Sequence, residues 1–313
     1  MRIGIVADSA CDLPNEIIDR ENVTILPVTI QIGQAVLADV RNEEATMNFL
    51  TGETAARAYE AESTPFTVQQ VHDLFLSKLV HEYDYVFCIT TTRTRSGIYD
   101  NAIQAGYTIL NDYKPIREKA GNNTPFALRV IDSQNVFAAV AVPVIEAARM
   151  RAAGDPPPKI RTQLEHLCNN THGYMVPPDL HYLRNRIKKR GDKSVSFLSA
   201  ALGTALDIKP ILHCNKGDTG PVGKVKGLDA AREKMFDFAG KRVKAGLLTP
   251  TMCISYGGDV ADLQRMPGYE RLRETCADNN IEVFETFMGL SGMVNVGKGA
   301  VVVAFAAEPH KFE

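Results

Sequence analysis

The sequence predicts an α/β fold with two domains, and three observations lead to this prediction. Its 313 residues are enough for about two domains of ordinary size. In the first half, short apolar runs alternate with helix-length runs, which predicts an N-terminal three-layer α/β/α domain with a mostly parallel sheet. In the second half, neighbouring apolar runs flank a glycine-rich turn. This pattern predicts a C-terminal α/β domain with a mixed or antiparallel sheet.

The elements of the first half follow from apolar spacing and from local start signals. Thr67 and Gln70 have the spacing of a capping box, so a helix is expected to begin at Thr67. Each candidate helix is long enough to cross over between parallel strands. The expected strands are residues 2–8, 23–32, 83–91 and 126–132, and the expected helices are residues 67–83, 96–113 and 134–154.

Three consecutive prolines at 156–158 mark the expected domain boundary. They cannot continue a helix, so we expect a stiff joint between an N-terminal domain at 1–155 and a C-terminal domain at 159–313. The glycine-rich turn beyond the joint predicts a hairpin. The expected elements there are a hairpin at 208–227, helices at 227–245 and 262–280, and strands at 251–258, 281–287 and 300–306.

Composition and charge argue against several classes of function. A net charge of -2 gives no basic surface for nucleic acid. No apolar run reaches the roughly 18 residues of a membrane span, and the start lacks the apolar core of a signal peptide. The cysteines form no C-x-x-C pair, and the histidines show no metal-ligand spacing. We therefore expect a cytoplasmic protein with no nucleic acid partner, no integral membrane segment, no metal and no other cofactor.

Hydroxyl and carboxyl side chains gather in three loops that follow expected strands, at residues 8–12, 90–97 and 132–135. Loops at the carboxyl ends of parallel strands meet at one edge of the sheet, where ligands bind. Each loop also precedes a helix, so helix capping is the competing explanation. The loop at 90–97 adds two arginines, and its Ser96 and Gly97 open a helix whose N-terminus attracts anions. This loop therefore suits a carboxylate or a phosphate.

Two more segments are candidates for a ligand site. Residues 62–67 place Ser63 and Thr64 on a loop stiffened by Pro65, and we expect this loop near the same sheet edge. Residues 194–212 are small and apolar on most faces. That segment either packs closely as a buried helix or forms a wall of an apolar ligand channel.

The segment GMVNVGKG at 292–299 is close to the phosphate-loop pattern G-x-x-x-x-G-K-[ST]. Gly299 stands where that pattern needs a hydroxyl to bind magnesium, and a strand follows where a helix should begin. A nucleotide-dependent phosphotransferase is therefore the weakest functional alternative. We interpret the glycines as places where the backbone passes close to a ligand head group.

Several motifs, in order along the chain, resemble the DegV family. The segment DSACDLP resembles the family's D-S-x-x-D-L-P, and RSGIYDNA resembles its L-S-G-T-Y-Q-x-A. LRVIDSQNV is similar to V-x-V-I-D-S, and LGTALDIKPIL with the following GPVGKVKG is similar to L-G-x-x-L-x-I-K-P-I-L and its hairpin. Each match is weak, but the ordered set covers almost the whole chain. The chain thus resembles a divergent member of this family.

The resemblance implies a lipid-binding protein, similar to the lipid-carrying subunit of bacterial fatty acid kinase, with no catalytic residues of its own. Family members bind one long-chain fatty acid between two α/β domains. The resemblance places the carboxylate at the edge of the N-terminal domain and the acyl tail in an apolar tunnel of the C-terminal domain. The family's ligand-contacting hydroxyls correspond to Ser63 and to Ser96 with Gly97, and Thr64 lies beside Ser63. Each buried CH₂ contributes about 0.8 kcal/mol, so the tail would supply most of the affinity.

Two departures from the family pattern bear on a kinase partner. Asn295 stands at the family's histidine position, and an amide cannot carry a proton as an imidazole can. The family's arginine is missing at 192–195, where Lys193 or Arg190 are the candidates to replace its charge. Because both family residues are associated with the phosphorylated state, the departures count against a kinase partner more than against ligand binding. A binding module for another acidic amphiphile, with no phosphotransfer role, is the main alternative.

Overall fold

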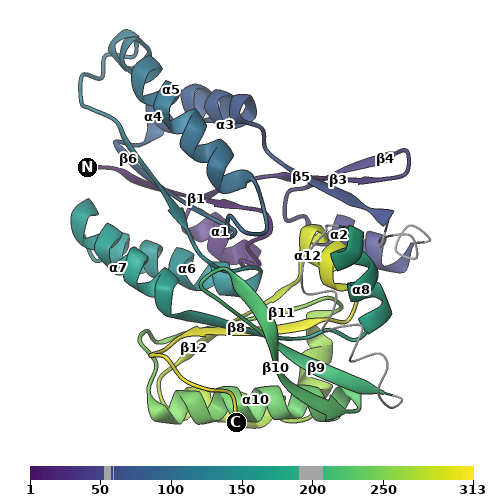
Figure 1. Cartoon of the computed structure of the whole chain (residues 1–313). Helices are drawn as coiled ribbons and strands as arrows, with labels where there is room; N and C mark the ends of the chain where they lie inside the picture. The colour runs from purple at the N-terminus through teal and green to yellow at the C-terminus, as the bar shows by residue number, and fades with distance from the viewer. Residues whose placement is uncertain (53–57, 59, 190–206) are drawn as a thin grey trace.

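The computed structural model describes residues 1–52, 58, 60–189 and 207–313, and it has the predicted two-domain α/β fold (Figure 1). The first large sheet has four strands in the order β2-β1-β6-β7, and all its neighbouring strands are parallel. The predicted parallel sheet is therefore confirmed. Its strands are β1 (Ile3–Asp8), β2 (Val23–Leu26), β6 (Tyr85–Thr90) and β7 (Ala127–Asp132).

Helices cover both faces of this parallel sheet, as predicted. Val6 and Cys88 face one side, and Ile5 and Phe87 face the other, because successive strand residues point to opposite faces. The first side is covered by α3 (Val68–Leu74), η2 (Phe75–Leu79), α4 (Val80–Glu82) and α5 (Ile98–Lys119). The second side is covered by α1 (Asn15–Arg20) and α6 (Ala138–Ala152), and α7 (Pro157–Asn170) packs beside α6.

The predicted capping box is present at the start of α3. Thr67 Oγ1 accepts a hydrogen bond from the Gln70 amide at 3.2 Å, and Gln70 Oε1 accepts one from the Thr67 amide at 2.9 Å. The expected helix at 67–83 then continues from α3 through one π-helical segment, η2, to α4. A capping box thus fixed the start of this run, as the spacing indicated.

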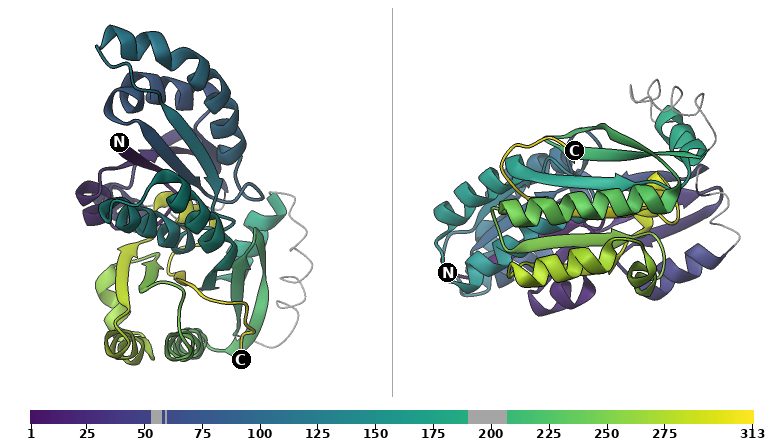
Figure 2. Two further views of the ribbon diagram at one scale, coloured as in Figure 1. Left: turned by 90° about the vertical axis from the view of Figure 1, so that its left-hand side faces the viewer. Right: turned by 90° about the horizontal axis from the view of Figure 1, so that it is seen from below.

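Helix α6 lies between the two large sheets, and this position explains its sequence. Every residue from Ala138 to Ala148 is buried. The parallel sheet lies against one side of the helix, and the strands β8, β11 and β13 of the second large sheet lie against the other. Figure 2 shows this helix layer between the sheets. A helix that is apolar on all sides is typical of such a position.

The second large sheet is mixed, as predicted. Its six strands have the order β10-β9-β8-β13-β11-β12, and all pairs are antiparallel except β11 with β12. The helices α10 (Leu228–Ala245) and α11 (Tyr269–Asp278) cover the face that points away from α6. The strands are β8 (Thr171–Val176), β9 (Ile208–Asn215), β10 (Asp218–Lys226), β11 (Thr251–Tyr256), β12 (Glu282–Phe287) and β13 (Val301–Ala306).

A small antiparallel sheet of three strands projects from the parallel sheet (Figure 1). The expected strand at 23–32 is in fact two strands, because Pro27 separates β2 from β3 and the chain moves to the small sheet. The sheet has the order β4-β3-β5. Its strands are β3 (Val28–Ile32), β4 (Ala35–Asp39) and β5 (Glu62–Pro65), and the helices not yet named are α2 (Glu43–Thr51), α8 (Leu180–Lys189) and α12 (Leu290–Val296).

Two predictions about helices were wrong in detail, and proline explains both. The expected helix at 262–280 is divided into the 3₁₀ helix η3 (Val260–Arg265) and α11, because Pro267 and the left-handed Gly268, with φ of 84°, interrupt it. Pro157 and Pro158 are not a stiff joint but the first turn of α7. Proline is well tolerated there because the first helical N–H groups need no partner within the helix.

Candidate functional site

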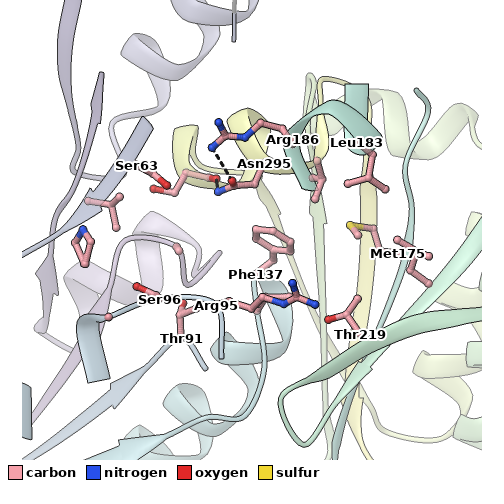
Figure 3. A pocket seen from close by; sticks show the side chains of 18 of the residues that line it. Ser63, Thr91, Arg95, Ser96, Phe137, Met175, Leu183, Arg186, Thr219 and Asn295 are labelled. Carbon is pink, nitrogen blue, oxygen red and sulfur yellow. Dashed lines mark hydrogen bonds between the residues drawn. The ribbon is translucent and has the colours of Figure 1, made fainter. Parts of the chain in front are cut away.

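A cavity of about 240 Å³ lies where the parallel, small and mixed sheets meet (Figure 3). The loops after β1, β6 and β7 all reach it, so the predicted sheet edge is part of its wall. The other walls come from β3, β5, α8, α12 and the strands β8 to β10. The cavity is lined by Ala10, Val28, Ser63, Pro65, Thr91, Arg95, Ser96, Gly97, Val136, Phe137, Met175, Leu183, Arg186, Leu212, Thr219, Gly220, Pro221, Ser291, Asn295 and Val296.

Most of the candidate ligand-binding residues line this one cavity. Ser63, Ser96, Gly97 and Asn295 come from three separate segments of the chain, and the fold brings them together. Thr64 does not line the cavity and is exposed. Its segment, expected to be a loop, is the strand β5, and strand residues alternate in direction. Ser63 therefore faces the cavity, whereas Thr64 faces away from it.

Arg186 is a cavity residue that the sequence did not single out. Its side chain is buried, with 2% of its surface exposed. Its Nη2 donates to Asn295 Oδ1 at 3.0 Å, and its Nη1 donates to the carbonyl oxygen of Ala61. Asn295 Nδ2 in turn donates to the carbonyl oxygen of Ser291 at 2.6 Å. Figure 3 shows Arg186 and Asn295 meeting on the side of the cavity where Ser63 lies.

The position of Arg186 bears on the arginine that the family motif led us to expect. The two candidates to replace its charge, Lys193 and Arg190, lie outside the described residues. Arg186 instead belongs to α8 and lies in the basic segment RNRIKKRGDK at 184–193, which also contains Arg190 and Lys193. The signal was present in the strong amphipathic pattern of this helix, whose buried face includes Leu183 and Arg186. A buried arginine on such a face marks a polar site within the interior.

A cluster of buried charged side chains holds the N-terminus of α12. We call it the ionic contact; it consists of the side chains of Asp12, Asp39 and Arg41 and the backbone of Gly289 and Ser291. Arg41 Nη1 donates to Asp12 Oδ1 at 3.1 Å. Asp12 Oδ1 also accepts from the Gly289 amide at 3.0 Å, and Asp39 Oδ2 accepts from the Ser291 amide at 2.8 Å. All three ionic side chains are buried. Residues of the first domain thus position the helix that carries Asn295.

Arg41 makes further bonds across the same contact. Its Nη2 donates to Thr286 Oγ1 at 3.2 Å and to the carbonyl oxygen of Phe287 at 3.1 Å, and its guanidinium lies 4.4 Å from the centre of the Phe287 ring. Burial raises the pKa of Asp12 to about 6, although the charge of Arg41 opposes this shift. Arg41 therefore connects the end of β12 to the loop after β1 in an interior where carboxylate charge is costly.

The hydroxyl-rich loop at 90–97 is used mainly for structure. Thr91 donates to Asp8 from its amide at 2.5 Å and from its hydroxyl at 2.9 Å. Burial raises the pKa of Asp8, and these hydrogen bonds partly offset the shift. The Ser96 hydroxyl accepts a hydrogen bond from the Ile98 amide at 3.3 Å, which helps to fix the turn before α5. The N-cap residue of α5 is Gly97, without a side-chain cap, so helix capping does not account for Ser96, which lines the cavity.

The tip of the β9–β10 hairpin packs against the loop at 90–97 and the loop after β7. We call this the hairpin contact; it consists of Thr94, Gln134 and Gly217. Thr94 Oγ1 donates to the carbonyl oxygen of Gly217 at 2.7 Å, and the Gly217 amide donates to the carbonyl oxygen of Gln134 at 2.7 Å. Gly217 has φ of 79°, a conformation that favours glycine. This contact contains only neutral groups and, like the ionic contact, joins segments of the two domains beside the cavity.

The remaining wall of the cavity is apolar. Phe137, with φ of 55°, is held in a strained left-handed conformation at the start of α6. It lies at the centre of the cavity wall in Figure 3. Within GMVNVGKG, Gly292 lies inside α12, where a Cβ atom would come within 3.4 Å of the Phe137 ring and 2.4 Å of Met288. This glycine therefore allows α12 to pack closely against the cavity wall.

The two later glycines of that segment do not approach the cavity. Gly297 and Gly299 have φ of 90° and 83°, and they turn the chain from α12 into β13. A phosphate loop should open a helix, whereas here the glycines follow one. The interpretation of these glycines as a head-group contact was wrong. The residues that α12 contributes to the cavity are instead Ser291, Asn295 and Val296. Of the expected channel wall at 194–212, residues 194–206 lie outside the described residues, and Leu212 lines the cavity.

Three histidines meet on the far face of the mixed sheet, which their sequence spacing did not indicate. His172 Nδ1 and His213 Nε2 are 3.0 Å apart, and Tyr174 Oη lies 2.9 Å from His310 Nε2. Burial lowers the pKa of His172 to about 3 and that of His213 to about 4. These rings are therefore neutral at ordinary pH. Among the described residues, no group of histidine, cysteine and acidic side chains could hold a metal ion.

Within the described part of the chain, no helix has both the length and the apolar character needed to cross a bilayer.

Comparison with known sequences shows a family match over nearly the full length. The model of the DegV family matches residues 2–308. A DegV domain-containing protein of Xanthomonas axonopodis pv. citri is 54% identical over 312 residues, covering 100% of this chain and 99% of the relative. Another, from Xanthomonas campestris pv. campestris, is 55% identical over the same length and the same shares of both chains.

Solved structures share the fold at low identity. DegV of Bacillus subtilis, described as a fatty acid binding protein, has a TM-score of 0.75 at 18% identity, covering 98% of this chain and 100% of its own. A stearic acid-binding protein of Eubacterium ventriosum has a TM-score of 0.75 at 22% identity, with 97% and 98% covered. The fatty acid kinase (Fak) B3 protein of Streptococcus pneumoniae, loaded with linoleic acid, has a TM-score of 0.73 at 19% identity, with 98% and 100% covered. With the family model matched from residue 2 to residue 308, this chain belongs to the DegV family.

Proposed function

We propose that this chain binds one long-chain fatty acid in the cavity between its two domains and acts as a lipid carrier. The names of structural relatives support the ligand class, since several are described as binding fatty acids. The carboxylate would lie among Ser63, Ser96 with Gly97, and Asn295. Thr64 would support β5 from the solvent side. The acyl tail would run along the apolar wall.

The observation that carries this proposal is the burial of Arg186. Its guanidinium lines a mainly apolar cavity, and its hydrogen bonds to Ala61 and Asn295 go to uncharged oxygens. A buried charge is costly unless an opposite charge compensates it. In the described part of the chain, Arg186 Nε and Ser291 Oγ are also buried without a hydrogen-bond partner. A ligand carboxylate would supply these acceptors and would add a negative charge to that of Glu62, which acts on Arg186 electrostatically.

The domain roles form part of the same proposal. Residues 1–155 would hold the carboxylate through Ser63 and Ser96, and residues 159–313 would supply most of the acyl site. Met175, Leu183 and Leu212, all on the C-terminal side of the boundary, line the cavity. Arg186 and Asn295 also come from this part, so the head group would contact both domains. A cytoplasmic location is supported by the six cysteines, all of which are free thiols in buried positions.

Copurifying lipid and a binding assay test the proposal together. Because the chain has no tryptophan, displacement of a fluorescent fatty acid is a suitable measurement. We expect Arg186→Ala to weaken palmitate binding by at least about tenfold, the effect of losing one charge-assisted hydrogen bond. Lys188→Ala, an exposed change on the same helix, is the control and should bind normally. If purified protein carries no acyl chain and neither palmitate nor oleate binds, the proposal fails.

Presentation of the ligand to a kinase partner is the finer form of the proposal, and Asn295 counts against it. Both ends of the Asn295 amide are engaged, with Arg186 and with the Ser291 carbonyl. The site can therefore hold a head group without an imidazole. Adding a family kinase and ATP to Asn295→His and to the wild type tests this form. We expect phosphorylated fatty acid only with the variant, and phosphorylation by the wild type would show that the histidine is dispensable.

The preference of the cavity for ligand chain length and head group distinguishes the main alternative, a module for another acidic amphiphile, from a fatty acid carrier. A module for another acidic amphiphile would bind an acyl phosphate or a sterol acid more tightly than any fatty acid. Competition between these ligands and palmitate at one protein concentration would decide between them. If palmitate binds more tightly than the acyl phosphate and the sterol acid, the proposal of a fatty acid carrier is supported.

A further inference from the structure

Resting on the proposed function, we infer that the cavity prefers a fatty acid carrying a second polar group, a hydroxyl or a carboxylate, which Arg95 and Thr219 recognise. Both residues line the cavity. Figure 3 shows the Arg95 side chain reaching past Phe137 toward Thr219, on the side of the cavity away from Arg186 and Asn295. The cavity therefore has a cationic side chain at each of two separated places.

The backbone around Arg95 is held firmly, so its side chain enters the cavity from a fixed position. The Arg95 amide donates to the carbonyl oxygen of Thr92 at 2.9 Å, and the Ser96 amide donates to the same oxygen at 3.1 Å. The preceding residue, Thr94, bonds the carbonyl oxygen of Gly217 at 2.7 Å. Thr219 is two residues beyond Gly217 on the same hairpin. The hairpin contact thus sets Arg95 and Thr219 opposite each other across the two domains.

The space between the two cations is apolar. Phe137, Met175 and Leu212 lie along this part of the wall. A ligand that matches this pattern has an acidic head group near Arg186, a hydrocarbon stretch along these side chains and a second acceptor near Arg95. Thr219, which is half-buried, offers a hydroxyl that can donate to or accept from that second group.

A plain hydrocarbon tail is a poor neighbour for Arg95. The side chain is half-buried, and a guanidinium keeps its charge at any ordinary pH. Arg95 already interacts with other protein groups, but methylene groups laid against it would exclude water from its remaining N–H donors, which disfavours that arrangement. A guanidinium has five N–H donors, so it can bond a ligand oxygen in addition to a protein group. A ligand hydroxyl or carboxylate would turn an unfavourable contact into a charge-assisted hydrogen bond.

The position of Arg95 in its motif suggests the variant for a test. RSGIYDNA has arginine where the motif it resembles, L-S-G-T-Y-Q-x-A, has leucine. Arg95→Leu removes the charge and keeps an apolar side chain of useful size. Arg93→Leu is the matched control, because Arg93 is exposed, pairs with Asp100 and does not line the cavity. Thr219→Val removes the second polar group of the pair while keeping its shape.

The experiment compares palmitate, ω-hydroxypalmitate, a mid-chain hydroxystearate and hexadecanedioate, each in competition with a fluorescent fatty acid. We expect the wild type and Arg93→Leu to bind at least one ligand with a second polar group roughly tenfold more tightly than palmitate, as one charge-assisted hydrogen bond allows. Arg95→Leu should lose this preference and bind palmitate more tightly than the wild type does. Thr219→Val should reduce the preference without reversing it.

The outcomes separate this inference from the proposed function. If the wild type binds palmitate at least as tightly as every other ligand, the inference is wrong and the fatty acid carrier stands. The same conclusion follows if Arg95→Leu keeps the full preference of the wild type. Thermal melting of each variant checks folding, and Thr219→Val provides an independent reading if Arg95→Leu does not fold. If no ligand binds to the wild type, both the proposed function and the inference fail.

Discussion

The ionic contact and the hairpin contact both join the domains beside the cavity, and they differ in chemistry. The ionic contact pairs the buried Arg41 guanidinium with the buried Asp12, bonds Asp39 to the Arg41 backbone amide and holds the N-terminus of α12. The hairpin contact consists of two hydrogen bonds between neutral groups and holds a glycine turn. Removing one member of a buried ion pair leaves an uncompensated charge, whereas losing a neutral hydrogen bond costs about 1 kcal/mol. The ionic contact is therefore the more sensitive of the two to substitution.

This difference assigns separate roles to the two sides of the cavity. The ionic contact fixes α12 and with it Asn295, so head-group geometry depends on it. The hairpin contact fixes Arg95 and Thr219 through weaker bonds. We therefore expect substitutions at the ionic contact to affect folding first, and substitutions at the hairpin contact to affect ligand selection first. Three predictions test this distinction, in order of expected effect.

The largest effect is expected from Arg41→Met. The variant leaves the buried Asp12 without its ion-pair partner, which should lower the free energy of unfolding by about 3–5 kcal/mol. Urea denaturation followed by far-ultraviolet circular dichroism measures this change. Arg20→Met is the control, since Arg20 is exposed on α1 and its loss should change stability by less than about 0.5 kcal/mol. Equal effects of the two variants would contradict the role given to the ionic contact.

The pH dependence of Asp12 should give an intermediate effect. Its folded pKa of about 6 lies above the usual aspartate value of 3.8, so the fold favours the protonated carboxyl. The stabilisation that protonated Asp12 contributes is fully present below about pH 4 and is lost as the pH rises through about 6. Relative to Asp12→Asn, the wild type should therefore lose roughly 1–3 kcal/mol of unfolding free energy between pH 4 and pH 7.

Taking the difference between these two proteins cancels the other buried groups, including Asp8 and His172. Parallel stability profiles for wild type and Asp12→Asn would show that Asp12 does not titrate in this range. A change at the hairpin contact should leave the profile parallel to that of the wild type, because its groups are neutral.

The smallest effect, measured as the difference from a matched control, is expected from Gly217→Ala. Gly217 and Gly121 have similar φ values of 79° and 73°, but only at Gly217 would a Cβ atom meet neighbours, Thr92 Oγ1 at 3.1 Å and Thr94 Cγ2 at 3.2 Å. Gly121→Ala should cost about 1–2 kcal/mol for the left-handed backbone alone. Gly217→Ala should cost about 1 kcal/mol more and release ligand faster, as measured by stopped-flow displacement. Identical costs would mean that the hairpin contact does not constrain the turn.

The sequence predicted the parallel sheet well because its signals are local. The strands at 83–91 and 126–132 are short apolar runs between helices with clear starts, such as the capping box at Thr67. The segment at 171–176 was harder, since β8 has polar and apolar residues that are buried on both faces. Helix α12 has seven residues, including one glycine, one asparagine and two β-branched valines, so propensity gave no signal for it. Tertiary packing against Phe137 and the ionic contact stabilise it instead.

The cavity was partly predictable for a related reason. Motif positions identified Ser63, Ser96 and Asn295, because short motifs preserve the local turns that present these side chains. Arg186 could not be found in this way, since its role depends on how α8 lies against α12. Arg41 likewise acts through residues more than 200 positions away in the chain. Contacts at that separation are set by the whole fold rather than by the neighbouring sequence.

Helix α6 has a consequence for how the molecule unfolds. Because its buried sides belong to the cores of both large sheets, neither domain can lose its structure without exposing an apolar helix that the other domain also covers. The two domains should therefore melt together in one cooperative transition, although domains joined only by a linker often melt separately. Stabilisation by a bound ligand would then extend across the entire chain, and a single thermal midpoint would report occupancy of the cavity.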